Sequence, residues 1–323
     1  MKFRFVFSRA LFSVFLITAG ALVLSGVPDG GGFPLQAEAQ QKVKLTFESG
    51  IDPALETMIS SGGEILVKPK INDQEVGWFL IDPAVEGMRI AASLAEGLEL
   101  DSSGTHHLVT TSKAEERRGW RCPVFVAGPC RAEGLILTEM ADEAGEEEGG
   151  EAVVGVIGTA LLRGVVAEVD MESGEVRLYD PESYDDTRTD WREFRLSHSL
   201  PVVRCRFEGD AEGEFGLDLR SPLGIIFFKP TVEAMGFLKN KVTRPGTISG
   251  ENFGKASVRI GIMEWFEAAG LRLEKTWAVF LTEDIAFPGS GELSGLIGRE
   301  ALREGILTLD YSRTRLAVTA KER

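Results

Sequence analysis

Aspartate is the chemically reactive residue type that recurs at matched positions in this chain. When the sequence is shifted by 136 positions, residues 65–82 fall on 201–218 without a gap, so Asp82 and Asp218 end equivalent segments. A carboxylate can accept or donate a proton in general acid–base catalysis. Aspartate is also a common turn residue, so two solvated and chemically idle side chains are the alternative interpretation.

Histidine and cysteine offer little other chemistry. The chain has three of each, and they are His106, His107, His198, Cys122, Cys130 and Cys205. There is no CxxC pair and no metal-ligand spacing, so we expect no metal site. In an oxidising compartment Cys122 and Cys130 could close a short loop and leave Cys205 unpaired, and three free or buried thiols are the alternative.

The segments that end on the two aspartates have the pattern of β-hairpins. Apolar and polar residues alternate, a turn follows at Asn72-Asp73 or at Gly209-Asp210, and the alternation resumes up to the aspartate. Each aspartate is followed by a helical stretch, at residues 95–98 and 234–237. We therefore expect the same strand–turn–strand–helix order in both halves.

A second pair of segments matches at a shift of 140 positions. Residues 153–179 fall on 293–319, and each copy has the pattern of a buried strand, a glycine turn, a short helix and a closing hairpin. The strand and turn residues that match in register are Gly155, Ile157, Gly158, Gly295, Ile297 and Gly298. Two matched blocks in the same order indicate an internal duplication.

A hairpin that ends in Asp, a short helix and then an apolar-apolar-Gly-apolar-Ile-Gly stretch resembles the pepsin and retropepsin class of aspartic peptidases. The order occurs twice, and the resemblance covers residues 64–180 and 200–320. It implies an all-β fold of two homologous pepsin/retropepsin-like β-barrel lobes, with a few short helices and a cleft between the lobes. It also implies that residues 153–158 and 293–298 pack beneath the aspartate loops.

By this resemblance Asp82 and Asp218 are the catalytic pair and face each other across the cleft. Two carboxylates that lie close together share one proton, because both cannot ionise easily. The ionised member takes a proton from a water lying between them, and the protonated member polarises the scissile carbonyl. The implied partner is an extended peptide or protein in the cleft, and no cofactor is implied.

The loops after both aspartates depart from the family pattern, which is Asp, then Thr or Ser, then Gly. The residues of these active-site loops are Pro83, Ala84, Leu219, Arg220 and Ser221. Pro83 and Leu219 lack the hydroxyl that joins the loops in the family, and Pro83 also lacks an N–H. Ser221 is a candidate for a substitute hydroxyl. Arg220 either favours the ionised form of Asp218 or points outward to bind a substrate carboxylate.

Two functions follow from these features. The first is an aspartic endopeptidase that hydrolyses peptide bonds with a water shared between Asp82 and Asp218, which the presence of both aspartates favours. The second is an inactive pseudo-peptidase that binds a peptide or protein by strand addition without cleaving it. The altered loops favour the second.

The flap that covers the cleft is expected to be formed by residues 101–140 in the first lobe and by residues 243–282 in the second. Gly104 and Gly119-Trp120 are the expected hairpin bends of the first of these segments. Trp120, Trp265 and Trp277 are expected in the core rather than in contact with substrate.

The first 39 residues are typical of a signal peptide. A basic start precedes an apolar stretch at residues 10–27, and Ala37-Glu38-Ala39 fits the cleavage pattern. An uncleaved membrane anchor is the alternative, since 18 residues could just span a bilayer. Either interpretation predicts an exported body, which is periplasmic, extracellular or anchored facing outward.

The remaining chain divides into a first lobe at residues 40–185, a connection at 186–199 and a second lobe at 200–323. Residues 40–63 are either a propeptide or an ordered first strand and helix. The formal net charge of −15 predicts repulsion from nucleic acid and from anionic membrane surfaces, so a membrane contact is expected only through an uncleaved N-terminus. The acidic run at 142–151 is expected to be a solvated loop.

Overall fold

The computed structural model describes residues 43–109, 114–140, 152–187, 189–197, 199–250, 254–285 and 291–321. The expected signal peptide at residues 1–39, the acidic run at 142–151 and His198 lie outside these residues. Strands dominate the described part and form three sheets. The short helices are α1 (Ala92–Gly97), α2 (Thr159–Leu162), α3 (Lys229–Ala234), α4 (Phe237–Asn240) and α5 (Arg299–Leu302). None of the described helices is long and apolar enough to cross a membrane.

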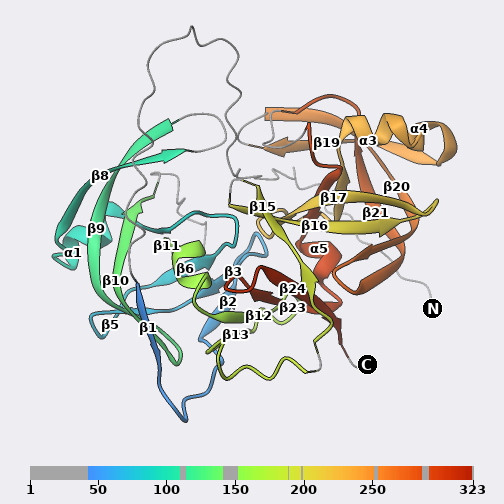
Figure 1. Cartoon of the computed structure of the whole chain (residues 1–323). Helices are drawn as coiled ribbons and strands as arrows, with labels where there is room; N and C mark the ends of the chain where they lie inside the picture. Colours follow the sequence, from blue (N-terminus) through green and yellow to red (C-terminus); the bar gives the residue numbers. More distant parts are fainter. Residues whose placement is uncertain are drawn as a thin grey trace, which may run out of the picture.

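The first lobe is built on an 11-stranded sheet (Figure 1). Its path runs β2-β3-β6-β11-β7-β10-β9-β4-β5, and β1 and β8 pair with β10 and β9. The strands are β1 (Lys44–Phe47), β2 (Thr57–Ile59), β3 (Ile65–Val67), β4 (Lys70–Ile71), β5 (Gln74–Glu75), β6 (Trp78–Ile81), β7 (Met88–Ile90), β8 (Ser102–Val109), β9 (Ala114–Ala127), β10 (Cys130–Glu139) and β11 (Val153–Ile157).

The second lobe is built on an eight-stranded sheet in the order β15-β16-β17-β22-β18-β21-β20-β19. The strands are β15 (Arg195–Ser197), β16 (Leu200–Phe207), β17 (Ala211–Asp218), β18 (Ile225–Phe227), β19 (Thr243–Gly250), β20 (Gly254–Ala268), β21 (Leu271–Leu281) and β22 (Gly295–Gly298). The order from β15 to β20 repeats the order β2-β3-β6-β11-β7-β10-β9 of the first lobe. The matched sequence blocks therefore fold into matched topologies, and a duplication as their origin stays a prediction.

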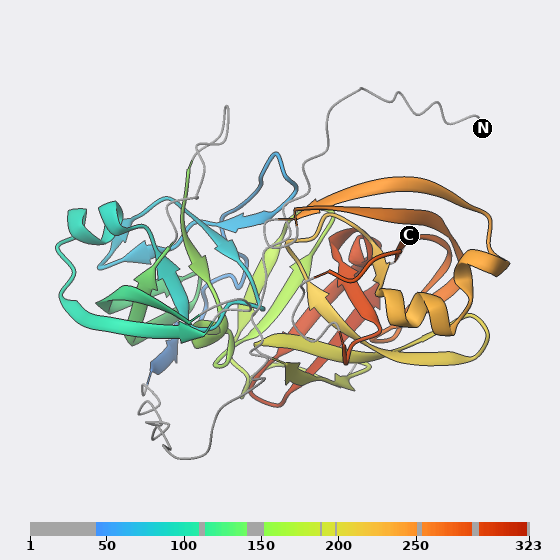
Figure 2. The ribbon, with the colours of Figure 1, turned by 90° about the horizontal axis from the view of Figure 1, so that it is seen from above.

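A third sheet joins the two lobes, which lie on either side of it (Figures 1 and 2). Its order is β13-β12-β23-β24-β14, so β12 from the first half of the chain pairs with β23 from the second half. The strands are β12 (Val166–Asp170), β13 (Val176–Tyr179), β14 (Arg192–Glu193), β23 (Gly305–Asp310) and β24 (Arg315–Ala320). The all-β, two-lobed fold with a few short helices is confirmed.

Local sequence explains the hairpins that lead to the aspartates. In β16 the side chains of Val203, Cys205 and Phe207 are buried while Arg204 and Arg206 are exposed, as the alternation predicts. Asn72 and Asp73 both have positive φ, as do Gly209 and Asp210. Tight hairpin turns require such angles, and Asn, Asp and Gly adopt them at low cost. Both predicted turns are therefore confirmed.

Aromatic side chains fill the second lobe. The rings of Phe207, Phe215 and Phe227 meet edge to face at centroid distances of 5.2–6.0 Å. Trp120 is buried as expected and Trp265 is half-buried. The prediction for Trp277 is wrong, because its side chain is 54% exposed and its ring packs under the Arg244 guanidinium at 5.0 Å. A cation over an indole face stabilises such a partly solvated position.

The predicted bends at Gly104 and Gly119 are also wrong. The two glycines lie opposite each other within the β8–β9 ladder, so neither of them forms a bend. An added Cβ at Gly119 would meet the His106 ring at 2.4 Å, so this glycine allows a side chain of β8 to cross the hairpin. At the N-terminal side, residues 43–63 supply strands β1 and β2 and no helix.

Candidate active site

Both aspartates stand where a strand ends between two neighbours. Asp82 follows β6, and its N–H donates to the Ile157 carbonyl at 3.0 Å. Asp218 is the last residue of β17 and pairs with Gly298 of β22. In each lobe the next strand along the chain, β7 or β18, lies on the far side of the β11 or β22 strand. Each chain segment after an aspartate therefore forms a loop around the end of a parallel neighbour.

The matched glycines permit close approach of these loops. A Cβ at Gly158 would lie 2.4 Å from the Val85 and Gly87 carbonyls, and one at Gly298 would lie 2.2 Å from the Leu223 carbonyl. Their backbone angles are ordinary, so the need for glycine is steric. The Thr159 hydroxyl, which the sequence did not single out, also accepts from Gly87 N–H at 3.1 Å.

Gly155 and Gly295, three residues earlier in each segment, also permit close packing that a side chain would prevent. A Cβ at Gly155 would overlap the Phe79 ring at 2.1 Å, and one at Gly295 would overlap the Ile226 carbonyl at 1.9 Å. Ile157 and Ile297, between these glycines and the next pair, are both buried in the core. The strand–glycine segments thus lie directly against the aspartate loops in both lobes.

Backbone N–H groups hold one oxygen of each carboxylate. Ala84 N–H donates to Asp82 Oδ1 at 2.9 Å. Arg220 N–H and Ser221 N–H donate to Asp218 Oδ1 at 3.1 and 3.3 Å. Asp218 Oδ2 is buried and has no hydrogen-bond partner. The orientation of the carboxylates therefore comes from loop backbone, and one oxygen of Asp218 is left for a proton or a ligand.

Both carboxylates are buried at 3% exposure and have raised pKa values. Burial raises the pKa of Asp218 to about 7, the charge of Asp82 adds to it, and the charge of Arg220 opposes it. Burial also raises the pKa of Asp82, against the charges of Arg220 and Arg89. Low-dielectric surroundings and a like charge both disfavour ionisation. The charge of Asp82 therefore acts on the Asp218 carboxyl group across the two lobes.

The altered loop residues are packed rather than hydrogen-bonded to each other. Leu219 joins the main hydrophobic core, and Ala84 packs against the apolar cluster of the second lobe that includes Leu200 and Ile226. The Ser221 hydroxyl accepts from Leu223 N–H at 3.4 Å, within its own loop. Ala84 thus makes an apolar contact between the lobes, in the loop where Pro83 replaces the Thr or Ser of the family pattern.

Tyr311, after β23, fixes the first loop from the bridging sheet. Its hydroxyl donates to the carbonyl of Pro83, and its ring packs against Phe194 at 5.1 Å. The side chain is buried. Pro83 has no N–H of its own to anchor the loop, so this carbonyl is the backbone group available there.

Replacing Tyr311 with phenylalanine is expected to lower the free energy of unfolding by about 1–2 kcal/mol, because the Pro83 carbonyl loses its buried partner. The measurement is urea unfolding followed by circular dichroism. Tyr184→Phe is the comparison, since its hydroxyl bonds the half-buried Glu168 of the bridging sheet. An unchanged free energy of unfolding for Tyr311→Phe would contradict the anchoring role.

Of the two roles considered for Arg220 from the sequence, the structure bears on the first, and contact with a substrate carboxylate stays a prediction. Its charge lowers the pKa of Asp82 and of Asp218. Its Nε lies 3.9 Å from Oε1 of Glu64, which comes from the first lobe. Arg299, directly after Gly298, is buried as well and donates to the Gly62 carbonyl at 2.7 Å.

Sequence reasoning did not find Glu64, Arg299 or Tyr311. A signal for Arg299 existed, since it occupies the position that Thr159 holds in the first copy. A buried arginine at one copy of a repeat and threonine at the other marks a local difference in chemistry. Glu64 and Tyr311 carry no such signal, because their approach depends on how the lobes meet.

The cysteines are three free, buried thiols. Burial raises the pKa of Cys122 and of Cys130 to about 12, so their thiolates are disfavoured. Within the described residues, no three His, Cys, Asp or Glu side chains gather in a way that could hold a metal. His106 Nε2 and Ser103 Oγ are hydrogen-bonded at 2.9 Å in the β8–β9 hairpin.

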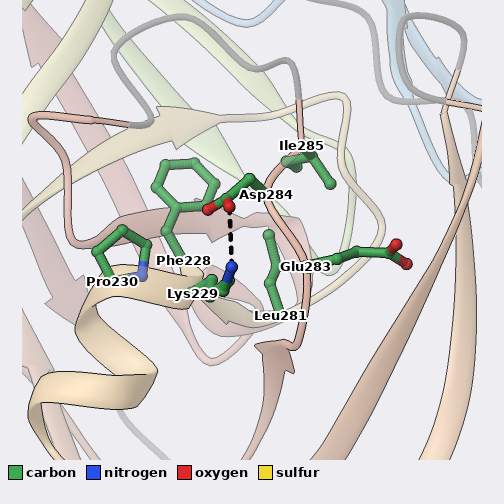
Figure 3. Close-up of a pocket in the computed structure, with 7 residues that line it drawn as sticks. All are labelled: Phe228, Lys229, Pro230, Leu281, Glu283, Asp284 and Ile285. Carbon is green, nitrogen blue, oxygen red and sulfur yellow. Dashed lines mark hydrogen bonds and ion pairs between the residues drawn. The ribbon is translucent and has the colours of Figure 1, made fainter.

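A small hollow of the second lobe lies between the start of α3 and the end of β21 (Figure 3). It is lined by Phe228, Lys229, Pro230, Leu281, Glu283, Asp284 and Ile285. Lys229 Nζ and Asp284 Oδ2 form an ion pair at 2.9 Å across it. It has room for about one water molecule and shares no residue with the aspartate loops.

Two curled sheets, each with an aspartate loop backed by a strand–glycine segment, and a sheet that joins them define the pepsin-like fold. An aspartic proteinase from Irpex lacteus has this fold with a TM-score of 0.53 and 12% sequence identity, over 84% of this chain and 97% of that one. Basic 7S globulin from soybean follows with a TM-score of 0.49 and 9% identity, over 87% and 96%. No protein-family model and no curated protein matches the sequence. At such identities the likeness establishes the fold alone.

Proposed function

We propose that this protein hydrolyses peptide bonds with a water molecule activated between Asp82 and Asp218. The observation that carries the proposal is the pair of buried carboxylates, one from each lobe, whose pKa values are both raised, with the charge of Asp82 among the causes of the rise at Asp218. Such a pair shares a proton and titrates as a unit. The substrate is an extended peptide bound between the lobes.

The chemistry needs one ionised and one protonated carboxyl group. The ionised carboxylate takes a proton from the water, whose oxygen forms a bond to the carbonyl carbon, while the protonated partner donates a hydrogen bond to the carbonyl oxygen. The leaving nitrogen then takes a proton as the C–N bond breaks. The backbone donors at Ala84, Arg220 and Ser221 keep the carboxylates oriented, and Asp218 Oδ2 is the oxygen without a protein partner.

The test is cleavage of a mixed peptide library from pH 3 to 8 by the wild-type protein, Asp82→Asn and Asp218→Asn. Each substitution is expected to lower cleavage roughly 10²–10⁴-fold, because it removes acid–base catalysis. Cleavage is expected to fall above about pH 7, where the pair loses its shared proton. Asp101→Asn, at an exposed position, is the control.

A second function, peptide binding without cleavage, is favoured by one observation. The Arg220 guanidinium, which favours ionised carboxylates, stands beside the pair and in contact with Glu64. A folded wild-type protein that cleaves nothing at any pH, yet binds peptides, would replace the first proposal with this one.

We also propose that the chain acts outside the cytoplasm. The basic start, the apolar stretch at residues 10–27 and the small residues at Ala37 and Ala39 support export. N-terminal sequencing of the protein recovered from its native host would show whether the chain begins near residue 40. An intact N-terminus in the cytoplasmic fraction would contradict export.

A further inference from the structure

The turn between β2 and β3 reaches two arginines of the second lobe. This turn, residues 60–64, reads Ser-Ser-Gly-Gly-Glu. Arg299 donates from Nη2 to the Gly62 carbonyl at 2.7 Å. Arg220 Nε lies 3.9 Å from Glu64 Oε1. A segment of the first lobe therefore covers two cations that stand beside Asp218.

Glu64 places a carboxylate against these cations. Ser60 Oγ donates to Glu64 Oε2 at 3.3 Å and accepts from Glu64 N–H at 3.1 Å, which fixes the side chain. The side chains of Glu64 and Arg220 are 23% and 18% exposed, so water only partly screens them. The protein itself thus demonstrates that a carboxylate fits beside Arg220.

Glu64 leaves the arginines incompletely satisfied. Arg299 Nη1, Arg220 Nε and Asp218 Oδ2 are buried and make no hydrogen bond. Arg299 is only 8% exposed, and this burial lowers its pKa. The charges of Glu64 and Asp218 oppose the shift, and the charge of Arg220 adds to it. Buried donors without partners are unfavourable. Two guanidinium groups with free N–H donors match the two oxygens of a carboxylate.

We propose that Arg220 and Arg299 form a carboxylate-binding subsite beside the Asp82–Asp218 pair, and that Glu64 occupies it when no ligand is bound. The ligand is a peptide that presents a carboxylate at this point, either as an acidic side chain or as its C-terminus. The inference rests on the proposed function in that the ligand is a peptide held at the aspartate pair. It adds which peptides the site prefers.

Binding requires that the ligand carboxylate replace Glu64. The turn that carries Glu64 contains Gly62 and Gly63, and Gly63 has a φ of +82°, a backbone conformation that residues with a side chain rarely adopt. Removal of the Glu64 charge should therefore strengthen binding of an acidic ligand. A purely structural ion pair predicts the reverse, namely a weaker fold with no gain in binding.

The experiment measures fluorescence anisotropy of labelled peptide pools whose peptide bonds are reduced and cannot be cleaved. One comparison sets free C-terminal carboxylates against C-terminal amides. The other sets one glutamate against one glutamine in amide-capped pools. Wild-type protein is expected to bind at least one acidic pool about tenfold more tightly than its neutral counterpart.

Arg299→Gln is expected to abolish this preference, and Glu64→Gln is expected to strengthen acidic-pool binding about three- to tenfold without changing neutral-pool binding. Arg303→Gln removes the same charge just after α5, from a side chain that is 56% exposed, and is the matched control. Circular dichroism checks that each variant is folded. If Arg299→Gln does not fold, Glu64→Gln and Arg299→Lys supply the decisive comparison.

Equal binding of acidic and neutral pools by the wild-type protein, or no binding of any pool, overturns the subsite. So does a Glu64→Gln variant that binds acidic pools no better than the wild type. Cleavage without charge preference would leave the proposed hydrolysis standing and remove the subsite. Charge-selective binding without cleavage would leave the subsite standing and contradict the proposed hydrolysis. The two proposals can therefore fail separately.

Discussion

Asp218→Asn is expected to raise the free energy of unfolding at pH 8 by roughly 2–4 kcal/mol and to change it little at pH 4. Burial and the charge of Asp82 raise the folded-state pKa of Asp218 from 3.8 to about 7. The protonated form is therefore favoured by folding. Its stabilisation is complete below the unfolded pKa and is lost as the pH rises toward 7. Asparagine stays neutral and keeps an oxygen for the Arg220 and Ser221 N–H groups.

The measurement is urea unfolding of wild type and variant at both pH values. Asp101→Asn, at an exposed position, is the control and is expected to act similarly at pH 4 and pH 8. A gain for Asp218→Asn that is the same at both pH values, or a loss at pH 8, would show that folding does not raise the pKa of Asp218. If the variant is both more stable and inactive, the aspartate is retained at a cost in stability, which is the pattern of a functional group.

Gly298→Ala and Gly158→Ala are each expected to lower the free energy of unfolding by roughly 3 kcal/mol or more, or to prevent folding. The added Cβ would lie 2.2–2.4 Å from backbone carbonyls of the adjacent aspartate loop. Backbone atoms in a close-packed layer cannot move aside as a side chain can. The loops themselves must shift, so cleavage and peptide binding should fall together with stability.

Gly97→Ala is the matched control for these two substitutions. Gly97 ends α1, has no neighbouring atom within 4 Å of an added Cβ, and should gain up to about 1 kcal/mol from the better helix former. Thermal and urea unfolding of the three variants make the comparison. If Gly158→Ala and Gly298→Ala are as stable as Gly97→Ala, the strand–glycine segments do not fit tightly against the aspartate loops.

The strand pattern and the matched blocks, with the family resemblance that they carry, were sufficient to predict the fold class. Alternation such as that of residues 203–207 fixes which side chains face the core, and a one-residue shift would bury Arg204 and Arg206. The hairpin turns at Asn72-Asp73 and Gly209-Asp210 followed from residues that adopt positive φ easily. These are local properties, so the sequence carries them directly.

The placement of Trp277 and of the two glycines in the β8–β9 ladder could not be predicted in the same way. An aromatic residue on a strand is buried or exposed according to which layer covers it, and Arg244 rather than a core layer covers Trp277. Gly104 and Gly119 face each other across a ladder, where a glycine admits a crossing side chain as readily as it forms a turn.

The sequence by itself identified the two matched aspartates, the matched glycines and the strand–turn–strand order in each half. Periodicity and repeated spacing are properties of the chain that need no tertiary structure. Only the tertiary structure decided what surrounds the aspartates. Glu64, Arg299 and Tyr311 are brought to them by pairing between β12 and β23 and by contact between the lobes. The raised pKa values likewise arise from burial and from charges distant in sequence, which act through space and leave no periodic trace in the chain.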